Sequence, residues 1–333
     1  MELRDGGQLL AMMPGYQVSC VLAAAADLGV CELVAQSPQT ADQAARQLAC
    51  DPRAVAILLD ALAGVGVLSK AAGQYSVPPA LRPFLIESSP QSVVAMLRHQ
   101  ASCLRRWARL PWVVKSGAAA DAGTSIRGAA ADQAAFIEGM DVINRDVADT
   151  LVREVNPGGV RCVLDVGGAS GTWTLAWLRA ESAARAILFD LPPVIPLAQE
   201  RLARSGLAER VELAAGDFST DALPRGADLA WVSAIIHQNS RAENRALYRR
   251  IAEALDVGGW ILIRDIVMDE SRTAPASGAL FAVNMLVATA GGNTYTLAEI
   301  AEELASAGFV DVHLVRRDEW MHNVVRARLP ADH

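Results

Sequence analysis

A strand that runs into a glycine-rich turn and then into a helix is the feature that most restricts how this chain can fold. Residues 164–171 read Leu-Asp-Val-Gly-Gly-Ala-Ser-Gly. Small residues at positions 167, 169 and 171 let the backbone turn sharply and approach a ligand closely. The helix that follows presents free backbone N–H groups at its start. The pattern therefore predicts an α/β sheet with a ligand site at the carboxyl end of this strand.

Strands and helices alternate from Arg161 onward, which is typical of a doubly wound α/β domain. Helices are expected between the strands, including Pro193–Ser205, Ala242–Leu255 and Leu297–Ala307. The last two strands are separated by only six residues, too few for a right-handed crossover, so they should pair antiparallel. We therefore predict a mostly parallel seven-stranded sheet with an antiparallel end strand. Its strands are expected at Arg161–Val166, Ala186–Asp190, Val211–Ala214, Asp228–Ser233, Trp260–Val267, Val310–Arg316 and Asn323–Leu329.

The first third of the chain is predicted to be mainly helical. One helix spans Tyr16 to Leu28 and ends at Gly29, a second begins at the capping box of Thr40, and a third follows Asp51-Pro52. A short hairpin across Ala72-Gly73 completes a winged-helix-like pattern. Further helical stretches are expected over Gln91–Val114 and Phe136–Val155. We place a helical winged-helix-like domain at residues 1–105 and an α/β domain with linking helices at 106–333.

A winged helix raises the question of DNA binding. The candidate recognition helix, Arg53 to Leu62, has one Arg, one Asp and no Lys, whereas a helix in the major groove normally brings several cations. The whole chain carries a net charge of −7. We therefore expect no nucleic-acid partner. The alternative is a dimerisation module whose apolar surface meets its copy in a second chain, and we predict a homodimer through this domain.

Composition excludes several other classes. The start of the chain lacks the apolar segment of a signal peptide, and no uninterrupted apolar run reaches the roughly 18 residues that a membrane span needs. The five cysteines form no C-x-x-C pair, which favours reduced thiols in a cytoplasmic protein. The five histidines form no H-x-x-x-H pair. We expect a cytoplasmic location, no membrane contact and no metal.

Two more acids follow the next two strands of the predicted sheet. Asp190 ends the second strand, where a carboxylate can accept hydrogen bonds from both ribose hydroxyls. Asp217-Phe218 follows the third, where an acid and an aromatic ring can hold an adenine. Each has a structural alternative, because Asp190 could cap a helix and Asp217 could be a solvated turn residue. The dinucleotide fingerprint G-x-G-x-x-G fails at Ala169 and Thr172, which disfavours a nicotinamide oxidoreductase.

These motifs resemble the S-adenosylmethionine-dependent small-molecule O-methyltransferase family, which includes plant caffeate-type and bacterial antibiotic-tailoring enzymes. Residues 165–171, Phe189-Asp190-Leu191-Pro192, Gly216-Asp217-Phe218 and 233–237 match its motifs, and residues 160–329 follow its pattern. The N-terminal third resembles its dimerisation domain less specifically. The resemblance implies secondary metabolism and S-adenosylmethionine as cofactor, with S-adenosylhomocysteine as product. It implies cofactor contacts at Asp165, Gly167, Gly168, Gly171, Asp190, Leu191, Asp217, Phe218 and Ser233.

The resemblance also assigns a catalytic base to His237, just past the fourth strand. A neutral imidazole there can take a proton from a hydroxyl as the methyl group arrives. The acid that orients the base corresponds best to Asp265, although Arg264 is adjacent and the match could be off by one. The family's second acid falls near Thr294, which cannot make an ion pair. In a structural alternative, His237 only caps the following helix.

A small-molecule acceptor, aromatic or polyketide-like, is the expected partner. Asn284 and Met285 match the family's acceptor-contacting helix. Phe136 and Met140, with Trp107 and Trp112, are candidates to complete an apolar pocket, although such side chains are more often plain core. Three alternatives stay open. They are methylation of carbon or nitrogen, a relative that keeps the cofactor for other chemistry, and a regulator that senses the cofactor and binds DNA.

Overall fold

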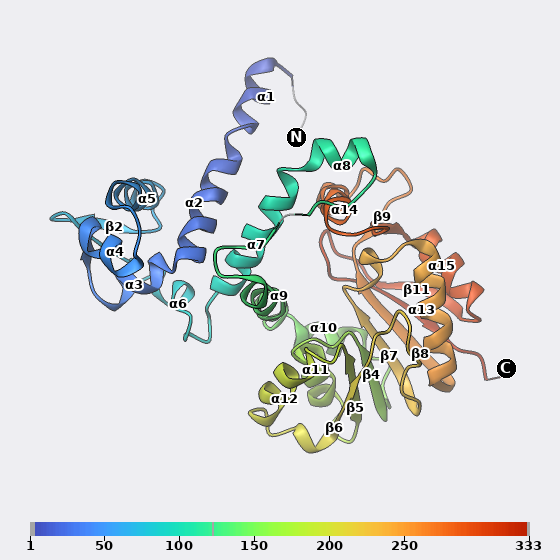
Figure 1. Cartoon of the computed structure of the whole chain (residues 1–333). Coiled ribbons are helices and arrows are strands. Elements are labelled where there is room, and N and C mark those ends of the chain that lie inside the picture. Colours follow the sequence, from blue (N-terminus) through green and yellow to red (C-terminus); the bar gives the residue numbers. More distant parts are fainter. Residues whose placement is uncertain (1–3, 122, 332–333) are drawn as a thin grey trace. The chain divides into compact units, whose positions relative to one another are not determined.

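The structure is a computed structural model that describes residues 4–121 and 123–331. The chain forms two compact units, drawn in Figure 1. The first covers the described residues up to Ala108 together with those from Asp121 to Ile143. The second covers those from Arg109 to Ala120 and from Asn144 onward. The segment from Asp121 to Ile143, which we had grouped with the C-terminal domain, lies in the first unit.

The first unit is mainly helical. Its helices are α1 (Gly6–Met12), α2 (Gly15–Leu28), α3 (Val30–Gln36), α4 (Ala41–Leu48), α5 (Pro52–Gly64), α6 (Arg82–Leu85), α7 (Val94–Trp107) and most of α9 (Ala129–Asn144). Gly29 ends α2 in the left-handed conformation, and Thr40 begins α4 with a complete capping box. Asp51 caps α5 by accepting from Ala54 N. These three helix boundaries confirm the predictions from local sequence.

A small antiparallel sheet lies in the same unit. The predicted hairpin is present as β2 (Ser69–Ala71) and β3 (Gln74–Ser76), and the turn residues Ala72 and Gly73 both have positive φ, as a tight two-residue turn requires. A third strand, β1 (Gln39–Thr40), pairs with β3 and was not predicted, since two residues carry no readable periodicity.

The second unit is built on a seven-stranded sheet, which confirms the predicted fold class. Four parallel pairings join β4 (Cys162–Val166), β5 (Arg185–Asp190), β6 (Val211–Ala215), β7 (Ala227–Ser233) and β8 (Leu255–Asp265). The spatial order is β11-β12-β8-β7-β4-β5-β6. The last strand of the chain, β12 (Asn323–Arg328), runs antiparallel between β8 and β11 (Val310–Arg316). Two short strands, β9 (Val267–Met268) and β10 (Tyr295–Thr296), pair beside the end of β8.

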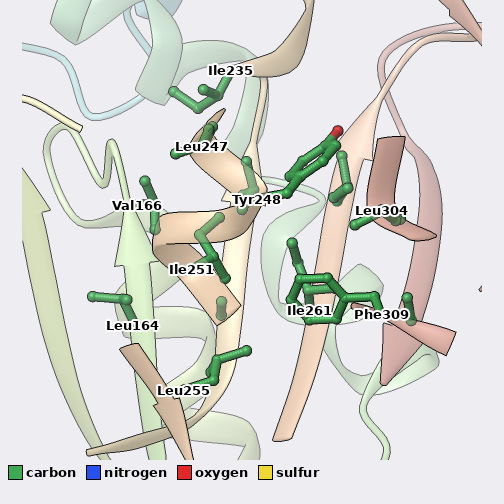
Figure 2. Close-up of a cluster of buried hydrophobic side chains, with 14 of the residues drawn as sticks. Leu164, Val166, Ile235, Leu247, Tyr248, Ile251, Leu255, Ile261, Leu304 and Phe309 are labelled. Atoms are coloured by element: carbon green, nitrogen blue, oxygen red, sulfur yellow. The ribbon is translucent and has the colours of Figure 1, made fainter. Parts of the chain in front are cut away.

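Helices cover both faces of this sheet (Figure 1). On one face α13 (Arg241–Ala254) and α15 (Leu297–Ser306) pack on the strands. Figure 2 shows this cluster, in which Leu247, Tyr248 and Ile251 of α13 lie against Leu164 and Val166 of β4. The opposite face is covered by α10 (Ala148–Val155) and α11 (Thr172–Ala180), with α12 (Ile195–Ala203) beside α11. Each fully buried large side chain contributes about 1.5–3 kcal/mol, so the two clusters hold the strand ends in place.

Two predicted helical stretches are interrupted. The stretch Gln91–Val114 consists of α7 and a separate α8 (Leu110–Ser116), with Pro111 in the first turn of α8. Proline has no N–H, and its ring blocks a preceding helical turn, so a continuous helix was the wrong prediction here. The stretch Phe136–Val155 likewise divides into α9 and α10. In addition, β8 begins at Leu255, five residues before the predicted start at Trp260.

One helical stretch among the described residues, Gly6–Leu28, is long and apolar enough to cross a membrane when judged only by length and composition. It comprises α1 and α2. We had found no uninterrupted apolar run of this length, because Pro14 and several polar residues interrupt it. Its apolar side chains include strongly exposed ones, such as Leu10 and Met13, at 73% and 70%.

Candidate active site

The glycine turn at the end of β4 is shaped by steric limits. Gly167 and Gly171 adopt positive φ, which glycine reaches without strain. A Cβ placed on Gly167 would lie 2.6 Å from Cδ1 of Ile235, and one on Gly168 would lie 2.6 Å from Cγ of Leu188. Ala169 also has positive φ, and its N–H donates to Asp190 Oδ2 at 2.7 Å. Glycine at 167 and 168 therefore lets the turn pack closely against Ile235 and Leu188, where a larger residue would clash.

Asp190 ends β5 beside this turn. Its Oδ2 accepts from Ala169 N and its Oδ1 accepts from Leu191 N, both at 2.7 Å. Each carboxylate oxygen keeps a second lone pair for a further donor. Burial raises the pKa of the Asp190 carboxyl above its ordinary value, although the two backbone bonds oppose this. The geometry fits the predicted contact with ribose hydroxyls, and the Leu191 side chain is exposed next to it.

Asp165 lies beneath the same turn. Its side chain is buried, and its Oδ2 accepts from the hydroxyl of Thr174 at 2.6 Å. Burial raises the pKa of the Asp165 carboxyl to about 7, and the bond from Thr174 limits the rise. The buried Asp165 carboxyl packs against the inner side of the glycine turn, next to Gly168.

The turn after β6 carries the third pair of predicted contacts. A Cβ on Gly216 would lie 2.5 Å from the Phe189 ring, and Gly216 N donates to Asp190 O at 3.0 Å. The half-exposed Asp217 accepts from the N–H and hydroxyl of Ser219, which lower the pKa of its carboxyl. Phe218 packs at the edge of the core, close to Gly167. The Gly167 turn, Asp190 and the Asp217 turn thus lie together at one edge of the sheet.

The structure brings His237 and Asp265 together. His237 sits in a short 3₁₀ turn, Ile236–Gln238, after β7, and Asp265 is the last residue of β8. His237 Nδ1 lies 2.9 Å from both carboxylate oxygens of Asp265. His237 is 9% exposed and Asp265 1%. The pairing removes the ambiguity with Arg264, whose side chain points to the other face of the sheet, because successive residues of a strand alternate.

Asp265 also accepts from its neighbour Ile266 N at 2.8 Å, which fixes the carboxylate. With Nδ1–H donated to Asp265, a neutral His237 has Nε2 free to accept a proton. The arrangement can therefore act chemically as an oriented general base. The hydroxyl of the buried Thr294 donates to Gly278 O at 3.4 Å, and Thr294 adds no charge to the pair.

Sequence reasoning missed two residues that contact His237, and it missed the contacts that Arg264 makes on the opposite face of the sheet. The Phe281 ring meets the His237 ring edge-on, with centroids 4.9 Å apart. Phe281 precedes Asn284 and Met285 by one helical turn, and that spacing was a usable signal. Asn293 N donates to His237 O at 2.9 Å. Arg264, 1% exposed, donates to Ser233 Oγ at 3.0 Å and to His322 Nδ1, and stacks on Trp173. No local sequence pattern predicts the contacts of Asn293 and Arg264.

The expected acceptor contacts fall on different units. Asn284 and the buried Met285 lie on α14 (Ala276–Ala288) of the second unit, the helix that carries Phe281. Phe136 and Met140 lie on α9 in the first unit, where the half-exposed Phe136 ring packs against His99. Their part in acceptor binding stays a prediction, as does that of Trp107 on α7 and the exposed Trp112 on α8. The described residues contain no group of three His, Cys, Asp or Glu side chains that could hold a metal.

Comparison with known proteins gives the family. The profile of the O-methyltransferase domain matches residues 112–310, and that of the O-methyltransferase dimerisation domain matches residues 10–85. The 3-hydroxy-5-methyl-1-naphthoate 3-O-methyltransferase of Streptomyces sahachiroi is 31% identical over 316 residues, which are 92% of this chain and 90% of that protein.

Two solved structures are similar over nearly the whole chain. Human N-acetylserotonin methyltransferase, solved in complex with S-adenosylmethionine, has a TM-score of 0.80 at 24% identity and covers 99% of both chains. The N,N-8-amino-8-demethyl-D-riboflavin dimethyltransferase of Streptomyces davawensis has a TM-score of 0.78 at 27% identity, covering 98% of this chain and 99% of that chain. Together with the two profiles and the naphthoate relative, this agreement shows that the chain belongs to the O-methyltransferase family.

Proposed function

We propose that this protein transfers a methyl group from S-adenosylmethionine to a hydroxyl of a small fused-ring aromatic acceptor, with His237 as general base. The single observation that carries the proposal is the His237–Asp265 pair at the end of β7 and β8. It lies at the same sheet edge as the glycine turn of β4. In open α/β sheets ligands bind at this edge.

Asp190, Asp217 and the glycine turn after β4 are the residues that would hold the cofactor. S-adenosylmethionine, when bound, supplies an electrophilic methyl group on a sulfonium whose sulfur keeps the electron pair of the bond that breaks. His237 accepts the hydroxyl proton at Nε2 as the acceptor oxygen forms its bond to the methyl carbon. Asp265 holds the imidazole in the required tautomer and stabilises the imidazolium that forms. No step in this scheme needs a metal.

Two relatives support this acceptor class. One is named for a naphthoate and the other for a riboflavin derivative, and both compounds contain fused aromatic rings. Methylation of an amine is a second candidate, because the riboflavin relative is an N,N-dimethyltransferase. The dimerisation profile covers α2 to α6, which favours assembly over DNA binding for this segment. All five cysteines are free, in keeping with the cytoplasmic location we propose.

The full-length protein should transfer labelled methyl from S-adenosylmethionine to a hydroxynaphthoate, and mass spectrometry should place the methyl on oxygen. The same compound with an amine in place of the hydroxyl should react more slowly. Preferential transfer to the amine would favour the second candidate, and absence of transfer to any hydroxylated or aminated ring in a panel would refute the proposal.

Asp190→Ala provides the control for the cofactor in that experiment. Loss of charge-assisted hydrogen bonds costs about 1.5–3 kcal/mol, so calorimetry should show S-adenosylhomocysteine binding weakened by roughly 10- to 100-fold. Unchanged affinity would show that Asp190 does not contribute to cofactor binding. The proposed activity would then be judged from the transfer assay alone.

The first unit should pair with its copy in a second chain. Light scattering of the full chain at micromolar concentration should give the mass of a dimer. The joint substitution Leu10→Glu and Met13→Glu should shift it to the monomer. Burying each exposed apolar side chain contributes about 1.5–3 kcal/mol, and each occurs twice in a dimer, so the dissociation constant should rise by on the order of 100-fold or more. A monomeric wild-type chain would contradict the homodimer.

A further inference from the structure

The loop between α14 and β10, residues 289–294, packs on the backbone that carries His237. Asn293 N donates to the carbonyl oxygen of His237 at 2.9 Å. A Cβ placed on Gly292 would lie 2.5 Å from that same oxygen and 3.1 Å from the carbonyl carbon of Gln238. The φ angle of Gly292 lies outside the left-handed region. Gly292 is therefore needed for close approach and not for its backbone conformation.

The same loop is tied to the end of α14. Thr289 donates its hydroxyl to Met285 O at 2.8 Å and accepts from Gly292 N at 2.9 Å. Next to it, a Cβ on Gly291 would lie 2.9 Å from Cβ of Ser240, the residue that caps α13. Gly292 thus lies directly against the backbone of the His237 turn, and the Thr289 hydroxyl ties it to the end of α14.

Helix α14 therefore reaches His237 at two points. Phe281 contacts the imidazole edge-on, and the loop after the helix holds the main chain of the same residue. This helix also carries Asn284 and Met285, the predicted acceptor contacts. We infer that Gly292 and Asn293 are positioning residues for His237, which fix the base relative to the acceptor-contacting helix. The inference rests on the proposed function.

The inference explains how the base is held without the family's second acid. That acid would fall near Thr294, one residue after Asn293, where this chain has no charge. Support from this segment comes instead from a backbone N–H and from steric contact. Because a displacement of about 1 Å can cost roughly 100-fold in rate, a loop that fixes the base by its main chain has a catalytic effect without touching substrate.

A double-mutant cycle on the full-length protein tests this inference. Gly292→Ala must push the His237 turn away, so it should lower kcat by about 10- to 100-fold while S-adenosylhomocysteine affinity stays within about twofold of wild type. In a His237→Gln background the same substitution should change the residual rate by less than about twofold, because its effect passes through the imidazole. An equal loss in both backgrounds, or a wild-type kcat in Gly292→Ala, would overturn the positioning role.

Two further variants separate the contacts of Gly292. A Cβ there would also lie 2.4 Å from Thr289 Oγ1. Adding Thr289→Ala removes that contact and leaves the one with His237, so the loss in kcat should persist. Recovery of the wild-type rate would place the cause at the end of α14 and overturn the inference. The double variant relieves the tighter clash, and it supplies the test if Gly292→Ala alone does not fold.

Gly64→Ala is the matched control, because Gly64 lies in α5 and no atom of the described residues lies within 4 Å of its Cβ position. It should leave kcat unchanged. The cycle also distinguishes two failures. A wild-type rate in His237→Gln would refute the base itself and with it this inference. A large loss in His237→Gln combined with additive behaviour of Gly292→Ala would refute only the positioning role.

Discussion

Replacement of His237 by glutamine should lower the rate of methyl transfer by about 10²- to 10⁴-fold at neutral pH. Glutamine is close to histidine in size and can still donate to Asp265, but its amide accepts no proton. The affinity for S-adenosylhomocysteine should stay unchanged, since His237 is not among the predicted cofactor contacts, which lie on β4, β5 and β6, on the turns after them and at Ser233 of β7. Single-turnover kinetics with saturating acceptor measure the effect on the chemical step alone.

The dependence of this loss on pH identifies its cause. As the pH approaches about 10, the ordinary pKa of a phenol, solution supplies the phenolate and the base becomes redundant. The difference between wild type and His237→Gln should therefore shrink. Gln238→Ala, a change at the exposed neighbouring residue, should leave the rate unchanged. A His237→Gln rate close to wild type at pH 7 would show that positioning alone drives the transfer.

The buried Asp165 should make the stability of the protein depend on pH in an unusual direction. Burial raises the pKa of its carboxyl from 3.8 to about 7 in the folded chain. The folded state therefore holds the proton more tightly, and the associated stability is present at low pH and is lost as the pH rises through about 7. The gap of about three pH units corresponds to on the order of 4 kcal/mol. Most acids, with lowered pKa values, give the opposite trend.

Asp165→Asn isolates this effect, because asparagine has the same shape and no ionisable group. The melting temperature of the variant should rise relative to wild type as the pH increases from 5 to 8. The stability difference between them should change by roughly 2–3 kcal/mol over that range. An amide nitrogen cannot accept the hydrogen bond that the Thr174 hydroxyl donates to Asp165 Oδ2. If that bond is lost, the stability of the variant falls by the same amount at every pH, so the trend with pH is unaffected. Asp217→Asn is the control, since a lowered pKa predicts a flat difference above pH 5. A flat difference for Asp165→Asn would contradict the raised pKa.

Much of the fold was predictable because its signals are local. The capping box at Thr40, the proline-led start of α5 and the glycine stop of α2 each depend on residues within one turn. The seven strands were readable as apolar runs between helices, and the short connection before β12 determined its antiparallel pairing. Where local signals conflicted, the prediction failed, as at Pro111, which divides an otherwise continuous helical pattern.

The candidate site divides in the same way. The sequence by itself determined the glycine turn, the acids at the ends of β5 and β6, and His237 after β7, because each motif is contiguous and strand ends meet at one edge of a parallel sheet. Only the tertiary structure decided whether Arg264 or Asp265 pairs with His237. Neighbouring residues of β8 point to opposite faces of the sheet, and the pairing of β8 with β7 and β12 determines which face each residue takes. It also brought Asn293 and Gly292 to the backbone of His237, more than 50 residues away in the chain. Such contacts depend on how α14 packs, and packing is set by the whole core and not by any local pattern.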